Sequence, residues 1–148
     1  MASIGSALAS SVGRKILMSL TGIVMLGFVI AHLAGNLQLL TGDGDAFNRY
    51  GHLLVSMGGL LVLAELFLIA CLVIHVVTAI SIVRGKRAAR PDAYSKLKSA
   101  GGASKKTLGS STMIYSGLLI LVFLIVHVKT FKYGPAEAEG YVTTVDGV

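Results

Sequence analysis

The chain has 148 residues, of which 54% are hydrophobic and only 14% are charged, whereas soluble domains average about 25% charged residues. This composition excludes an ordinary soluble domain and favours a membrane protein. The net charge of +6 does not indicate a nucleic-acid partner, because 8 of the 13 Lys and Arg residues lie between residues 84 and 106. We interpret that basic cluster as the flank of a membrane span, with anionic lipid or an acidic partner surface as a second interpretation.

Three apolar segments predict transmembrane helices at about residues 16–41, 53–83 and 108–131. The first segment contains no charged residue, and the only charged residue in the second is Glu65. About 20 apolar residues are enough to cross a hydrocarbon core of ~30 Å. The predicted fold is therefore an all-α transmembrane bundle, with residues 1–148 forming one membrane-anchor domain, or part of one.

The ends of these helices carry local signals. The Gly and Asp residues at 42–45 are typical of a turn and should end the first helix. Hydroxyl side chains at 110–112 are expected to cap the third helix, and Gly134 with Pro135 should close it. Residues 1–13 are small and weakly polar, and are compatible with a short interfacial helix.

Basic residues are distributed unevenly between the two sides of the predicted bundle. The N-terminal flank has Arg14 and Lys15 and the loop 84–107 has eight basic residues, whereas the first connection has only Arg49. The positive-inside rule therefore predicts that the N-terminus and the loop 84–107 are cytoplasmic. Cys71, the only cysteine, excludes an internal disulfide and a site with several thiolate ligands.

Two histidines lie at matching depth in separate spans. His32 follows Lys15 by 17 residues, about 25 Å along a helix, and His127 follows Ser111 by 16 residues, about 24 Å from the same side. Ionisable side chains within a membrane are costly and usually face the bundle interior or a functional pathway. A porphyrin between helices needs an imidazole on each side at one height, and His32 with His127 meets that requirement.

The third intramembrane histidine occupies a different layer. His75 precedes Arg84 by nine residues, which is about 14 Å along the helix. It has no histidine partner at its own level within the chain. For all three intramembrane histidines, an ordinary interhelical hydrogen bond is the competing interpretation. We interpret His52 as an interfacial residue, with a quinone hydrogen bond as the less favoured alternative. Glu65 is either protonated and hydrogen-bonded or part of a proton route.

An ordered set of motifs resembles cytochrome b subunits of succinate:quinone and quinol:fumarate oxidoreductases, of the type with five helices and two haems. No single motif is decisive, but the matches cover nearly the whole chain in the family's order. They comprise RKILMSLTG at 14–22, HLAGNL at 32–37, AFNRYGH at 46–52, Glu65, His75, Arg90-Pro91, TMIYSG at 112–117 and His127.

The resemblance implies that histidines are the axial ligands of haem iron. His32 and His127 would hold the b-type haem farther from the cytoplasmic subunits. His75 would supply one ligand of the nearer haem, and the second would come from a further helix. No C-x-x-C-H motif occurs, so the haems would be bound non-covalently. Family members have two more helices, so we expect that the chain is a fragment that stops after the third helix. The alternatives are that another membrane polypeptide supplies the remainder, and that the chain holds only one complete haem.

The resemblance also implies positions around the haem nearer the cytoplasm. Ser19 matches a polar position near that haem, and Arg14, Lys15 and Arg84 are candidates to bind haem propionates. Basic residues at helix ends are equally expected from topology alone.

The implied function is electron transfer in an inner (cytoplasmic) membrane. The chain would be a multi-pass anchor subunit of succinate dehydrogenase or fumarate reductase, passing electrons between flavoprotein and iron–sulfur subunits and membrane quinone. It would have no active site for the dicarboxylate. The alternatives are a cytochrome b subunit of another quinone-linked complex and a haem-free helical anchor.

Overall fold

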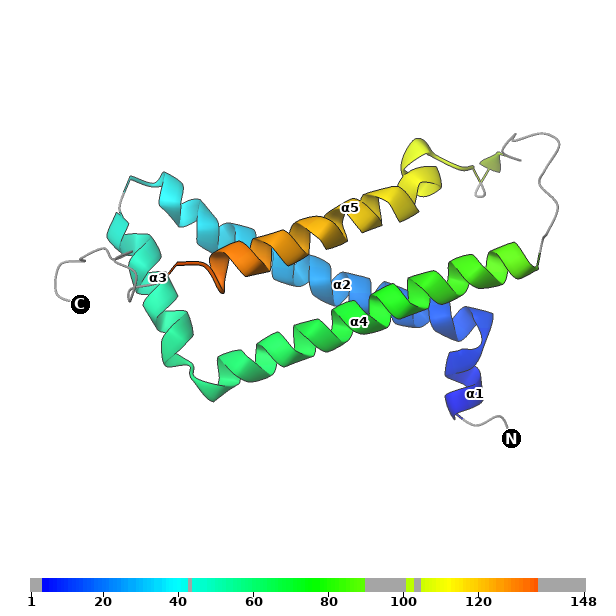
Figure 1. The fold of residues 1–148 in the computed structure, drawn as a ribbon, viewed down its shortest axis with the longest axis horizontal. Helices are drawn as coiled ribbons and strands as arrows, with labels where there is room; N and C mark the ends of the chain where they lie inside the picture. The colour runs from blue at the N-terminus through cyan, green and yellow to red at the C-terminus, as the bar shows by residue number, and fades with distance from the viewer. Residues whose placement is uncertain (1–3, 43, 90–100, 103–104, 136–148) are drawn as a thin grey trace. The chain divides into compact units, whose positions relative to one another are not determined.

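The computed structural model describes residues 4–42, 44–89, 101–102 and 105–135. Every regular element within these ranges is a helix (Figure 1). The elements are α1 (Ile4–Ala9), α2 (Ser11–Asn36), the 3-10 helix η1 (Leu37–Leu40), α3 (Gly44–Ser56), α4 (Gly59–Ala88) and α5 (Leu108–Phe131). The prediction of an all-helical chain is confirmed for the described residues.

Three of these segments are long and apolar enough to cross a membrane. They are Ser11–Leu40, Gly59–Ala88 and Leu108–Phe131. The chain is therefore built as a multi-pass membrane protein, as the composition predicts. It divides into two units, residues 1–92 with α1 to α4 and residues 93–144 with α5, and each is described by itself.

The first span begins earlier than the predicted residue 16. Ser10 caps α2, because its hydroxyl accepts a hydrogen bond from the backbone N–H of Gly13 at 3.0 Å. This cap allows the polar turn at residues 11–15 to be helical. At its other end α2 gives way to η1 at Leu37, so the last turn of the span is a 3-10 helix. The short helix α1 occupies the small, weakly polar N-terminal segment.

The predicted second span, 53–83, is wrong at its start. Gly58 has φ +53° and ψ −120°, a backbone conformation that is open mainly to glycine. This residue separates α3 from α4, so Leu53 belongs to α3 and the spanning helix begins at Gly59. Helix α4 also continues beyond residue 83 to Ala88, with basic residues in its last turn, where cations interact favourably with the helix dipole.

Helices α2 and α4 run antiparallel and pack together in the first unit. Arg14 lies opposite Ser81 and Thr21 lies opposite His75. The two helices cross in this region and diverge toward α3 (Figure 1). In agreement with this, every residue from 26 to 34 in α2 is exposed.

The cap of α5 differs from the predicted cap at 110–112. Thr107 is the N-cap, because its hydroxyl accepts from the Ser110 N–H at 3.1 Å while the Ser110 hydroxyl accepts from the Thr107 N–H at 3.0 Å. Ser110 is thus the second half of a capping box. The helix ends at Phe131, before Gly134 and Pro135, and the expectations for residues 90–100 and the tail lie outside the described residues.

The middle of α3 is held against the end of α2 by a close contact between Tyr50 and Gly35. A Cβ atom added to this residue would lie 2.6 Å from Cζ of Tyr50. We therefore expect Gly35→Ala to lower the free energy of unfolding in detergent by about 1–3 kcal/mol, the usual cost of overpacking. Gly27→Ala is the matched control, since nothing lies within 4 Å of the added atom. Denaturant titration of helicity measures both, and equal losses in the two variants would contradict the contact.

Candidate functional site

His75 lies in the interface between α4 and α2, with its imidazole against one turn of α2. Its Nδ1 atom is 3.1 Å from the carbonyl oxygen of Met18 and 3.1 Å from the hydroxyl oxygen of Thr21. Both hydrogen-bond contacts of this imidazole are made by Nδ1, and Nε2 makes none within the described part of the chain. The half-buried ring is therefore held at one nitrogen and open at the other.

Small residues let the imidazole approach α2. A Cβ atom added to Gly22 would lie 3.4 Å from Cε1 of His75, so the ring already occupies the space beside this glycine. Thr21, Cys71 and Thr78 are 7%, 6% and 7% exposed, and they are the buried side chains of α2 and α4. Small side chains at helix interfaces allow close backbone approach within a membrane.

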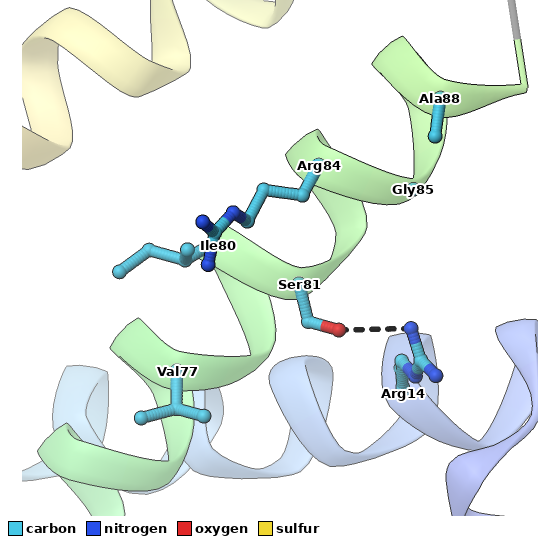
Figure 2. Close-up of a pocket in the computed structure, with 7 residues that line it drawn as sticks. All are labelled: Arg14, Val77, Ile80, Ser81, Arg84, Gly85 and Ala88. Atoms are coloured by element: carbon cyan, nitrogen blue, oxygen red, sulfur yellow. Dashed lines mark hydrogen bonds between the residues drawn. The ribbon is translucent and has the colours of Figure 1, made fainter.

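One end of the α2–α4 interface carries a hollow of about 510 Å³ with two arginines in its wall. Arg14 donates a hydrogen bond from a guanidinium nitrogen to the Ser81 hydroxyl at 2.8 Å, and Arg84 projects from the following turn of α4 (Figure 2). The remaining wall is mainly apolar, formed by Val77, Ile80, Gly85 and Ala88. A guanidinium next to apolar walls can bind a carboxylate or a phosphate through two parallel hydrogen bonds.

His32 and His127 each stack on a phenylalanine one turn earlier in the same helix. The ring centroids of Phe28 and His32 are 5.4 Å apart at an interplanar angle of 24°. The corresponding values for Phe123 and His127 are 5.3 Å and 26°. Two histidines in separate units thus have the same local aromatic support. In α5, Phe131 also contacts His127, at 4.9 Å and 44°.

The other predicted site residues are less closely grouped. Ser19 is exposed on α2 and makes no hydrogen bond to His75 within the described ranges. Thr21, two residues later, is the hydroxyl that contacts His75, and sequence reasoning did not select it. His52 is exposed on α3 and Glu65 is half-buried on α4.

The described residues contain no group of three or more His, Cys, Asp or Glu side chains that could bind a bare metal ion. A haem needs only axial ligands from the protein, and the open Nε2 of His75 is suited to that role. Comparisons with models of protein families, with curated proteins and with solved structures gave no match to this chain.

The bond between Arg14 and Ser81 is the polar link at this end of the interface. Ser81→Ala removes the acceptor, and we expect the free energy of unfolding to fall by about 1.5–3 kcal/mol, as for a hydrogen bond to a charged group. Ser56→Ala is the control, because among the described residues its hydroxyl bonds only to the Leu53 carbonyl of its own helix. In a double-mutant cycle, Ser81→Ala should lower the free energy of unfolding only slightly when Arg14 has already been replaced by Gln. If Ser81→Ala lowers it equally in both backgrounds, the bond contributes nothing to stability.

Proposed function

We propose that the chain is a haem b-binding membrane anchor that passes electrons between flavoprotein and iron–sulfur subunits and membrane quinone. The main support for the proposal is the difference in hydrogen bonding between the two ring nitrogens of His75. Its Nδ1 is occupied by protein acceptors, and its Nε2 has no protein partner within the described chain. Histidines that bind metals commonly bond through the other ring nitrogen to a carbonyl, carboxylate or water.

His32 and His127 are proposed as the two axial ligands of one haem. They follow the starts of α2 and α5, at Ser11 and Leu108, by 21 and 19 residues, a difference of about 3 Å along a helix. The matching phenylalanine stacks support this assignment, because a ring held by its neighbour loses less rotational freedom when it binds a ligand. His75 is proposed as one ligand of a second haem.

Arg14 and Arg84 are proposed to bind the propionates of the haem at His75. Ser81, which bonds to Arg14, follows His75 by six residues, about 9 Å along α4. The hollow that both arginines line is therefore one to two turns from the imidazole. Bound haem would supply a one-electron redox centre, while the chain would hold its iron, neutralise its carboxylates and exclude water from it. Ser19 stays a weaker proposal for this haem.

The chain itself is proposed to be non-catalytic toward the dicarboxylate. Its partners would be the flavoprotein and iron–sulfur subunits on the cytoplasmic side, membrane quinone, lipid and a further membrane polypeptide or segment that supplies the second ligand opposite His75. The inner (cytoplasmic) membrane is the proposed location. Three spanning helices with intramembrane histidines support the proposal.

The ligand assignments predict which histidine variants lose the same b-type haem component in a redox titration of the purified membrane complex. His32→Ala and His127→Ala should each remove the same b-type component, and the double variant should lose nothing further. His75→Ala should remove the other component. His52→Ala is the control and should keep both, since this side chain lies on α3 outside the spanning helices. Loss of different components in the His32 and His127 variants would overturn the pairing.

The basic loop 84–107 is proposed to contact the catalytic subunits. Most of this loop lies outside the described residues, so the test changes the charge of the loop and uses no structural contact. Replacing Lys96, Lys98, Lys105 and Lys106 with glutamate should abolish co-purification of the flavoprotein and iron–sulfur subunits, because the attraction to an acidic surface becomes repulsion. Glutamate at Lys129 and Lys132, at the other end of α5, is the matched control and should leave the complex intact. An intact complex in both variants would rule out this docking surface.

A further inference from the structure

The contacts of His75 indicate which of its two nitrogens carries the proton. Nδ1 lies 3.1 Å from the Met18 carbonyl oxygen. A carbonyl oxygen can only accept a hydrogen bond, so Nδ1 must carry the hydrogen. If Nδ1 were unprotonated, two lone pairs would face each other at this distance.

The hydroxyl of Thr21 is consistent with the same assignment. Its oxygen is 2.8 Å from the Leu17 carbonyl and 3.2 Å from the Met18 carbonyl. The single hydroxyl hydrogen is therefore donated to a backbone carbonyl of α2, and the oxygen lone pairs are left to accept the Nδ1–H of His75 at 3.1 Å. A doubly protonated imidazolium would also satisfy these contacts, but a charge at this depth is costly in a membrane.

We infer that Thr21 and the Met18 carbonyl together hold His75 as the neutral Nδ1–H tautomer, so that Nε2 is the only nitrogen available as a ligand. Thr21 is then a positioning residue. The tautomer follows from the hydrogen bonds alone, whereas the identity of the group that Nε2 binds rests on the proposed haem function. The hydrogen bond at Nδ1 also orients the ring.

The burial of Thr21 protects its hydrogen bond to His75 from water. Thr21 is only 7% exposed, so little water can replace its oxygen as an acceptor. The space beside Gly22 accommodates the ring edge, since a Cβ atom added to this glycine would lie 3.4 Å from Cε1. The ring is thus fixed by two acceptors from α2 and by its close approach to the backbone at Gly22.

Nitrogen-15 NMR of the full chain in lipid bilayers, labelled at histidine and prepared without haem, tests the tautomer directly. In the wild type, the spectrum should show His75 with a protonated Nδ1 and an unprotonated Nε2. Thr21→Val keeps the shape of the side chain but removes one of the two acceptors, so a fraction with protonated Nε2 should appear beside the form that the Met18 carbonyl still holds. Thr21→Ser restores the hydroxyl and should restore the wild-type spectrum. A wild-type His75 protonated at Nε2 would overturn the inference without any variant.

Thr78→Val is the matched control. Thr78 is also 7% exposed and lies on α4 within one turn of His75, but it makes no hydrogen bond to this imidazole in the described chain. Its variant should leave both nitrogen signals unchanged. An equal effect of the two valine variants would assign Thr21 a role in packing only and would contradict the positioning role.

A second measurement separates the tautomer from the haem. In the full membrane complex, Thr21→Val should weaken haem retention at His75 by roughly 10- to 100-fold, as loss of a hydrogen-bond partner behind a metal ligand typically does. The midpoint potential of that haem should shift, because hydrogen bonds around the ligands help to set the potential of haem iron, while the other haem is unchanged. If the NMR result holds but the wild-type complex contains no haem, the proposed function fails and the tautomer stands. Unchanged retention and potential in a haem-containing variant would refute the positioning role.

Discussion

The hydrogen bonds between His75 and one turn of α2 are the interaction on which the first unit depends. They join the middle of α4 to Met18 and Thr21, and they fix the antiparallel register in which Arg14 meets Ser81. A shift of one helix by a single residue would move the imidazole about 1.5 Å along its partner and break both contacts. The histidine therefore sets the register of the two helices, and its second nitrogen has no hydrogen-bond partner in the part of the chain that the structure describes.

This dependence on polar contacts follows from the solvent. In lipid, apolar side chains gain little by packing on each other instead of on acyl chains, so small residues and interhelical hydrogen bonds hold helices together. The α2–α4 interface has this composition: its buried side chains are Thr21, Cys71 and Thr78. The long aliphatic side chains of the same helices are mostly exposed, as expected of surfaces that face lipid or further helices.

Much of the architecture could be predicted from the sequence, because hydropathy and charge alone identify segments that must cross a membrane. The break at Gly58 could not, since a glycine within an apolar run is compatible with either a helix or a turn until its φ is known. In the site, His75 could be selected from its position within a span. Thr21 and the Met18 carbonyl could not, because any residue on the facing helix offers a backbone oxygen. The repeated spacing of Phe28 with His32 and of Phe123 with His127 was a signal available in the sequence and was missed.

The central claim is that the intramembrane histidines bind haem b, and the most direct measurement is a pyridine haemochrome assay of the purified membrane complex. The assay reports the type of haem and its molar ratio to the chain. The account predicts at least one haem b for each chain, because His32 and His127 suffice for one complete site. It predicts a second where the partner ligand of His75 is present. A complex that purifies intact from haem-replete cells without haem b would contradict the account, and the histidines would then be interhelical hydrogen-bonding residues only.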